Sequence, residues 1–270
     1  SLSAVRIDTL PGAGSLTLSG VAVTAGQVIS LADITAGNWV FTPAANANGT
    51  GYASFTFSVR DSNNTYDAAP NTLTVNVTAQ NDAPTDLALS ANTVDENVAN
   101  GTSIGTVSGT DPDSGDTQSY SLTDTAGGRF AIDSSTGEIT VANGTLLNYE
   151  AAASHSVTVR VTDSGGLTYD ETFTVNLTNV NESPTGADAT VTINEDGSHT
   201  MTAANFGFSD VDAGDSLSAV RIDTLPGAGS LTLSGVAVTA GQVITVADIT
   251  AGNWVFTPVA GANGTGYASF

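Results

Sequence analysis

The chain has 270 residues, 40% of them hydrophobic, and a net charge of −22 from 27 carboxylates set against five arginines. This length predicts two or three domains, the apolar content is too high for intrinsic disorder, and the acidic surface argues against nucleic-acid binding. Cysteine is absent, only two histidines occur and no apolar run is long enough for a membrane helix, so the sequence offers no thiolate chemistry and no membrane span.

The predicted secondary structure is strand throughout. Apolar and polar residues alternate with period two in four segments, which in chain order are Tyr52–Asp61, Asn71–Ala79, Ser154–Asp163 and Glu171–Val180. Turn signals at Ser134–Gly137 and Asp163–Gly166 separate short strands, and we expect Phe130, Ile132 and Ile139 to face the core around the first of these turns. No segment shows a sustained helical period.

The chain contains a long internal repeat. Residues 1–55 recur as residues 216–270, with a period of 215 residues, and 51 of the 55 positions are identical. The differing pairs are Ser30/Thr245, Leu31/Val246, Ala44/Val259 and Asn46/Gly261. Near-identity over this length indicates recent duplication in an array. We therefore interpret the chain as an excerpt from a longer protein.

Two polar segments that end in proline mark the module boundaries. They are Gln80–Pro84 and Asn179–Pro184, and proline favours a short, stiff, extended junction. The prediction is the C-terminal part of one repeat (1–83), a complete module (84–183) and the N-terminal part of the next copy (184–270). The expected fold is all-β, with tandem Greek-key β-sandwich modules in a linear array.

Paired aspartates suggest metal ligands. Asp111 with Asp113, and Asp210 with Asp212, have the Asp-x-Asp spacing that places two carboxylates on one side of an extended backbone. Calcium takes six to eight oxygen ligands of this kind. A solvated turn is the alternative for either pair taken alone.

The middle module resembles a cadherin domain along its whole length. The motifs that carry the resemblance are Asp95–Asn97, Asp111–Asp113, Arg129–Ile139, Leu147–Glu150 and the strand that ends at Asp163. The outer modules resemble the immunoglobulin-like and cadherin-like tandem repeats of large bacterial RTX-type biofilm adhesins, through Asn38–Asp61, Ile193–Gly197 and Phe208–Leu217. Two residues depart from the cadherin pattern, which has aspartate where Asn148 and Glu182 stand.

The cadherin resemblance implies calcium ions at both junctions. The ligands that it implies at the first junction are Asn81, Asp82, Asp111, Asp113 and Asp163. At the second junction they are Glu96, Glu150, Asn179, Asn181, Glu182, Asp210 and Asp212. Asp116, Asp124 and Asp215 are interpreted as ordinary loop acids, and Asp61 and Glu195 as residues that serve junctions outside this excerpt.

No catalytic constellation is recognisable, so the chain is not expected to be an enzyme. His155 and His199 are interpreted as structural or surface residues. Trp39 and Trp254 occupy the same position in the two copies and are expected in the core, with stacking on a sugar as the alternative.

The expected function is mechanical. Calcium would neutralise the crowded carboxylates and join neighbouring modules into a stiff extracellular stalk of a cell-surface adhesin, whose length near-identical copies supply. The alternatives are modules that bind polysaccharide, homophilic cell–cell contact, and assembly into an extracellular fibre. Because the repeat is cut at both ends, we expect either a continuing chain or head-to-tail association of copies.

Overall fold

The computed structural model describes all residues from Ser1 to Phe270 and consists almost entirely of β-strands. The prediction of an all-β chain is thus confirmed. None of its helices has the length and apolar sequence needed to cross a bilayer. The chain divides into two compact units, one of Ser1–Asn92, Asn100–Ala142 and Ser156–Thr174, the other of Thr93–Ala99, Asn143–His155 and Val175–Phe270.

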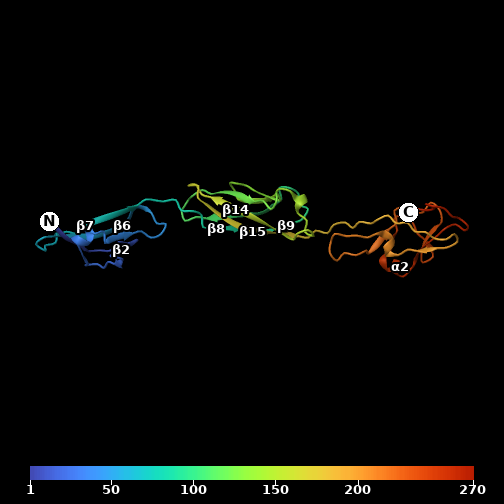
Figure 1. The fold of residues 1–270 in the computed structure, drawn as a ribbon, viewed down its shortest axis with the longest axis horizontal. Helices are drawn as coiled ribbons and strands as arrows, with labels where there is room; N and C mark the ends of the chain where they lie inside the picture. Colours follow the sequence, from blue (N-terminus) through green and yellow to red (C-terminus); the bar gives the residue numbers. More distant parts are fainter. The chain divides into compact units, whose positions relative to one another are not determined.

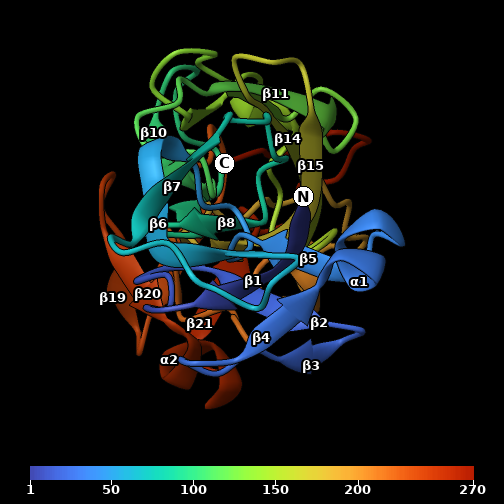
Figure 2. The same ribbon diagram turned by 90° about the vertical axis from the view of Figure 1, so that its left-hand side faces the viewer.

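The N-terminal strands form two antiparallel sheets in the first unit, with the orders β4-β1-β6-β7 and β3-β2-β5. Helix α1 packs against β1 and β4 (Figure 2). The strand β5 has one neighbour only and is an edge of its sheet. The bounds are β1 (Leu2–Ile7), β2 (Ser15–Leu18), β3 (Val21–Ala22), β4 (Val28–Ser30), α1 (Leu31–Thr35), β5 (Trp39–Thr42), β6 (Gly49–Asp61) and β7 (Asn71–Val77).

The central strands form two four-stranded sheets, with the orders β12-β13-β10-β8 and β11-β14-β15-β9. Figure 1 labels β14 and β15, which are neighbours in the second sheet, and β9 pairs with β15 in parallel. The bounds are β8 (Asp86–Leu89), β9 (Thr93–Asp95), β10 (Ser103–Thr110), β11 (Ser119–Asp124), β12 (Phe130–Ile132), β13 (Glu138–Val141), η1 (Gly144–Leu146), β14 (Ser154–Thr162) and β15 (Thr168–Thr178). Two such sheets make the predicted β-sandwich.

The C-terminal strands lie in the second unit and form sheets with the orders β16-β21-β18-β19 and β17-β20. Strands β18 to β21 and helix α2 repeat β2 to β5 and α1 at the 215-residue spacing. The bounds are β16 (His199–Thr200), η2 (Ala203–Phe206), β17 (Ala219–Arg221), β18 (Ser230–Leu233), β19 (Val236–Ala237), β20 (Val243–Thr245), α2 (Val246–Thr250) and β21 (Trp254–Thr257).

The four predicted strands are all present, as β6, β7, β14 and β15. Buried residues recur along β6, β14 and β15, whereas β7 has only two half-buried residues on one face, Val75 and Val77. In β14 the buried residues are Val157, Val159 and Val161, with half-buried neighbours between them. The predicted core residues around the Ser134–Gly137 turn behave similarly, because two are buried and one is half-buried (Phe130, Ile139 and Ile132, respectively). One face of each strand therefore builds the core.

The strand-only prediction is wrong at α1 and α2. Ser30 begins α1 as its N-cap: its hydroxyl accepts a hydrogen bond from the backbone N–H of Asp33 at 3.1 Å and donates to the Asp33 carboxylate at 2.6 Å. Thr245 and Asp248 make the same pair of bonds at α2. Such a cap satisfies backbone groups that a helix end leaves open. Five residues are too few to show a helical period in the sequence.

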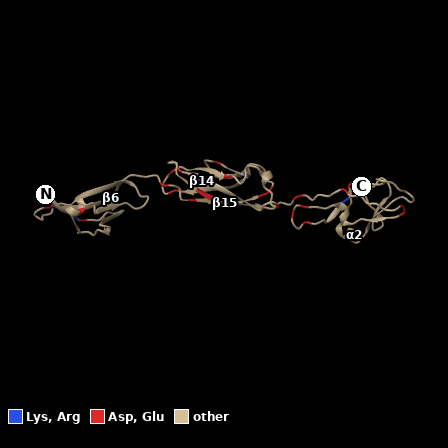
Figure 3. Ribbon diagram, in the orientation of Figure 1, with Lys and Arg blue, Asp and Glu red and all other residues tan.

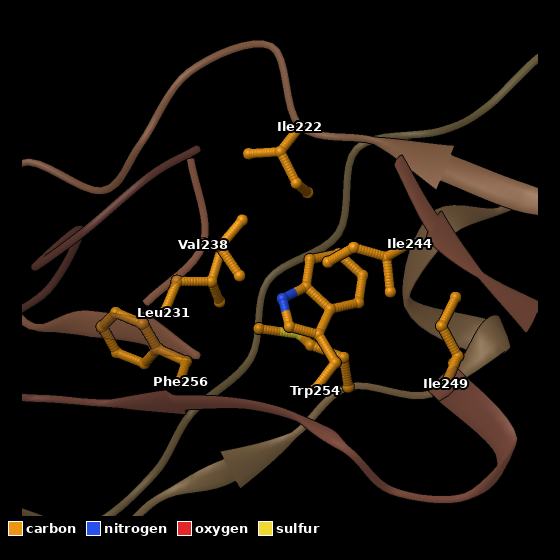
Figure 4. Packing of buried hydrophobic residues seen from close by; sticks show 8 residues of the cluster. Ile222, Leu231, Val238, Ile244, Ile249, Trp254 and Phe256 are labelled. Atoms are coloured by element: carbon orange, nitrogen blue, oxygen red, sulfur yellow. The ribbon is translucent and has the colours of Figure 1, made fainter. Parts of the chain in front are cut away.

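The core of the second unit surrounds Trp254, which is 0% exposed (Figure 4). Figure 4 shows Ile244, Val238 and Phe256 around the indole ring. The expectation that both tryptophans belong to the core is confirmed for Trp254, whose fully buried ring cannot stack on a sugar, whereas Trp39 is only half-buried.

Candidate metal centre

The predicted ligands of the first junction gather in loops at the ends of β10 and β14. Asp111 directly follows β10, Asp163 directly follows β14, and Asp116 lies in the loop between β10 and β11. Their carboxylate oxygens lie within 4.8 Å of one another. We call these three residues the Asp111 cluster.

The Gln80–Pro84 segment makes polar contacts with these loops. The side-chain amide of Asn81 donates to Asp163 Oδ2 at 2.8 Å, and the backbone N–H of Asp82 donates to Asp113 Oδ2 at 2.7 Å. Asn81 lies so close to Gly165 that a Cβ at that glycine would stand 2.3 Å from Asn81 Oδ1. The predicted linker is therefore held to the loops that carry the carboxylates.

Three glutamates form a second group, the Glu96 cluster: Glu96, Glu150 and Glu182, again with oxygens within 4.8 Å of one another. Glu96 is only 1% exposed. Its two oxygens accept backbone N–H groups, Oε2 from Tyr149 at 2.7 Å and Oε1 from Val180 at 3.0 Å. A buried carboxylate thus ties together the ends of three chain segments.

A third group, the Asp210 cluster, contains Asp210, Asp212 and Asp215 within the same 4.8 Å limit. Asp212 is buried, and its oxygens accept from the side-chain amide of Asn179 at 2.9 Å and from the backbone N–H of Glu182 at 2.8 Å. Glu182 therefore connects the Asp210 cluster to the Glu96 cluster.

Glu182 lies in a strongly negative environment. Desolvation is the largest cause of a raised pKa at its carboxyl group, and the negative charges of Glu96, Asp212 and Glu150 raise this pKa further. A hydrogen bond from the Asn97 amide, at 2.7 Å to Oε1, acts in the opposite direction. The net result is a pKa above the ordinary glutamate value, because desolvation and neighbouring negative charges both disfavour the ionised carboxylate.

The structure supplies no protein cation to these groups. Its ion pairs are Arg6–Asp8, Arg160–Asp170 and Arg221–Asp223, and none includes a cluster residue. Acidic residues, red in Figure 3, far outnumber the arginines. Two cluster oxygens, Asp111 Oδ2 and Glu182 Oε2, are buried without a hydrogen-bond partner.

An unpaired, partly desolvated carboxylate is costly, and a hard cation removes that cost. Carboxylates and amide oxygens are also the ligands that calcium prefers. The three clusters therefore fit a divalent cation of this type.

The sequence interpretation missed two cluster members, Asp116 and Asp215, which it assigned to ordinary loops. A signal was present, because the loops Asp111–Asp116 and Asp210–Asp215 share the spacing Asp-x-Asp-x-Gly-Asp. The Ser164 hydroxyl hydrogen-bonds Asp116 and lowers the pKa of its carboxyl group. Asp124 does behave as a loop acid: its Oδ1 accepts the Ala126 N–H at 2.9 Å.

Five residues predicted as ligands lie outside the three clusters, namely Asn81, Asp82, Asp113, Asn179 and Asn181. Asn81, Asp82 and Asn179 make the hydrogen bonds described above, and the other two are described here. Asp113 accepts the linker N–H described above, and its own N–H donates to Asp111 Oδ1 at 2.8 Å. Asn181 is exposed, and its side chain donates to the backbone carbonyl of Glu182 at 2.7 Å. The structure places both beside the clusters.

Comparison with known families gives the domain type. Residues 91–178 match the family model of the cadherin domain, and residues 8–78 match that of a cadherin-like domain. These two segments are therefore similar to cadherin and cadherin-like domains, respectively. Cadherin domains are a non-enzymatic adhesion fold of extracellular proteins. His199, outside these segments, makes a local contact, in which its Nε2 lies 3.2 Å from Asn205 Oδ1.

Solved structures of protocadherins have the same fold. The extracellular domain of protocadherin gammaB4 has a TM-score of 0.57 at 18% identity, covering 91% of this chain and 38% of that one. Domains 1–4 of protocadherin gamma B7 have a TM-score of 0.53 at 15% identity, covering 96% and 59%. The cis-dimer structure of protocadherin gammaB7 domains EC3–6 gives 0.50 at 19%, covering 89% and 58%. The chain thus spans less than two thirds of each of these proteins. No curated protein matches its sequence.

Proposed function

We propose that the chain is a calcium-rigidified stalk region of a long bacterial cell-surface adhesin or extracellular fibre protein. Its three modules are residues 1–83, 84–183 and 184–270. The observation that carries this proposal is that carboxylates cluster where each predicted linker meets the neighbouring loops. At Glu182, for example, the backbone N–H donates to Asp212 and the side-chain carboxylate lies beside those of Glu96 and Glu150.

Calcium would act at these junctions by neutralising like charges. The Asp111 cluster with Asn81, and the Glu96 and Asp210 clusters with Asn179, would hold the ions. When bound, calcium supplies positive charge and joins oxygens from segments that otherwise repel one another. The linkers then lose conformational freedom, and the modules keep a fixed orientation.

A bacterial stalk is supported by the repeat itself. Residues 1–55 and 216–270 are almost identical, and near-identical copies are useful where length is the property that matters. The motifs of the outer repeats resemble those of RTX-type biofilm adhesins. The absence of cysteine and lysine and the net charge of −22 suit a soluble extracellular array.

Homophilic contact between copies is the second candidate, because the domains are of an adhesion type and one similar structure is a protocadherin cis-dimer. Direct binding of polysaccharide has weaker support, since Trp254 is buried and no comparison points to a carbohydrate partner.

Single-molecule fluorescence tests the stalk. The cysteine-free chain accepts a dye pair at two exposed positions, through Val21→Cys and Val236→Cys. In calcium the distribution of transfer efficiencies should be narrower than in EDTA, and Glu182→Gln together with Asp111→Asn should leave it broad. A distribution equally broad in calcium, at concentrations where calorimetry shows binding, would exclude the stalk. Calcium-dependent dimers in sedimentation would then favour homophilic contact.

A further inference from the structure

The turn between β14 and β15 contacts the first linker through a single carboxylate. The turn includes Asp163–Gly166, and Asp163 is only 6% exposed. One oxygen of Asp163, Oδ1, accepts the backbone N–H of Leu167 at 2.7 Å and closes the turn. The other oxygen, Oδ2, accepts the side-chain amide of Asn81 at 2.8 Å. This carboxylate therefore joins the turn to the linker.

The Asn81 carboxamide lies directly against Gly165 in that turn. A Cβ on Gly165 would stand 2.3 Å from Oδ1, 2.4 Å from Cγ and 2.5 Å from Nδ2 of Asn81. Favourable contacts between carbon atoms lie at about 3.5–4 Å, so these distances are strong overlaps. All three atoms belong to the carboxamide and none to the Asn81 backbone. A side chain at residue 165 and the Asn81 carboxamide therefore exclude each other.

The turn is fixed on its other side by Asp116. The backbone N–H of Ser164 donates to Asp116 Oδ2 at 3.2 Å, and the Ser164 hydroxyl makes a further hydrogen bond to the same carboxylate. Both Asp116 and Asp163 belong to the Asp111 cluster. Displacing the turn would therefore break contacts with the cluster, whereas Asn81 is exposed and its side chain is free to rotate away. A side chain at residue 165 would thus displace Asn81 rather than the turn.

The neighbouring glycine has a different cause. Gly166 has a φ of +89°, in the left-handed region that favours glycine, and a Cβ there would meet nothing within 4 Å. Gly165 lies outside the left-handed region. The feature that needs glycine at residue 165 is therefore the contact with Asn81, and the two glycines form a matched pair for experiment.

We propose that Gly165 is a positioning residue for the first linker, because its missing side chain seats the Asn81 carboxamide against Asp163. The amide nitrogen of Asn81 then donates to Asp163, and the side-chain oxygen stays available as a ligand. The consequence for calcium rests on the proposed function, in which Asn81 serves the Asp111 cluster. The seat itself consists of protein atoms alone, so it is measurable in EDTA.

A double-mutant cycle in EDTA tests the seat. The full chain is compared with Gly165→Ala, Asn81→Ala and the variant that carries both, by urea unfolding followed by circular dichroism. Gly165→Ala should lower the urea midpoint of the parent chain and have little further effect after Asn81→Ala, because the atoms that it displaces are then gone. Gly166→Ala, the control, should lower the midpoint equally in both backgrounds, since only backbone strain acts there. An equal effect of Gly165→Ala in both backgrounds, including no effect in either, would overturn the proposal.

Isothermal titration tests the step from the seat to the cation. Gly165→Ala should weaken by about tenfold the class of calcium sites that Asp111→Ala removes, as expected when a group that orients a ligand is disturbed, and should leave the other class unchanged. Gly166→Ala should weaken that class far less. Binding by Gly165→Ala equal to that of the parent chain would overturn its role toward the cation. A parent chain that binds no calcium, while the cycle in EDTA still shows coupling, would contradict the calcium function and support the seat alone.

Discussion

At the scale of single residues, two glutamates of the Glu96 cluster, Glu96 and Glu150, have different roles. Glu96 is buried and accepts two backbone N–H groups, so it organises the segments around it as well as offering charge. Glu150 is exposed and contributes its carboxylate to the same cluster. Substitution of Glu150 therefore separates cation binding from folding better than substitution of Glu96.

Glu150→Ala should weaken the tighter class of calcium sites by roughly tenfold or more, because one charged ligand is lost. The tighter class is expected at the Glu96 and Asp210 clusters, where the larger number of carboxylates gathers. Asp111→Ala should affect the weaker class instead. Isothermal titration measures both, with Glu138→Gln, a carboxylate outside the clusters, as the control. If Asp111→Ala removed the tighter class and Glu150→Ala left it unchanged, the assignment of ligands would be wrong.

The raised pKa of Glu182 predicts a pH dependence in EDTA. A carboxyl group whose pKa is higher in the folded state binds more protons folded than unfolded, so the free energy of unfolding falls as pH rises through that interval. The interval begins near the ordinary glutamate value of about 4.3 and extends upward. Aspartates with lowered pKa, such as Asp8 and Asp133, act at lower pH and in the opposite direction.

Melting temperatures in EDTA should therefore fall as the pH rises above the ordinary glutamate pKa, and calcium should bind more weakly at the lower pH because the proton competes. Glu182→Gln removes the titrating group and should flatten this part of the profile. A slope in the variant equal to that of the parent chain would assign the effect to other carboxylates.

At the scale of elements, the turn between β12 and β13 depends on one glycine. Gly137 has a φ of +72°, and a Cβ there would stand 2.4 Å from the carbonyl oxygen of Val107. Gly101 has a φ of +87° with open space around it. Alanine at either position would be strained by the positive φ. Only at Gly137 would its Cβ also collide with a neighbouring atom.

Gly137→Ala should lower the free energy of unfolding of the central domain by about 3 kcal/mol, the sum of a left-handed backbone and a forced shift of β10. Gly101→Ala should cost only about 1 kcal/mol. Urea unfolding followed by circular dichroism compares the two. Equal midpoints would show that the Gly137 turn tolerates displacement.

The sequence predicted the elements whose signals are long and local. Strands β6, β7, β14 and β15 follow from alternation over seven or more residues, and the carboxylate groups follow from motif order. Helices α1 and α2 were missed because a single capped turn has no period. Asp116 was missed because its proximity to Asp163 depends on how two loops fold, which spacing in one strand does not reveal.

At the scale of the whole molecule, the balance of charge makes stability depend on ions. The net charge is −22, and the structure contains three salt bridges, all partly exposed. Surface ion pairs contribute little, and self-repulsion opposes the compact state. Most of the electrostatic relief must therefore come from solution cations.

Calcium should raise the melting temperature of the chain substantially relative to EDTA. At about 10 mM calcium and a Kd near 10⁻⁴ M, each site contributes about 2.7 kcal/mol of stability.

Simple screening of the net charge would also stabilise the chain, so sodium chloride of equal ionic strength is the first control and magnesium, which prefers rigid octahedral sites, is the second. The shift in calcium should exceed both. Glu150→Ala combined with Asp111→Ala should reduce the calcium shift towards the sodium value. The melt of this variant in EDTA is its own baseline, because Asp111→Ala also removes the acceptor of the Asp113 N–H. Superimposable melts in calcium and in sodium chloride would exclude specific calcium sites.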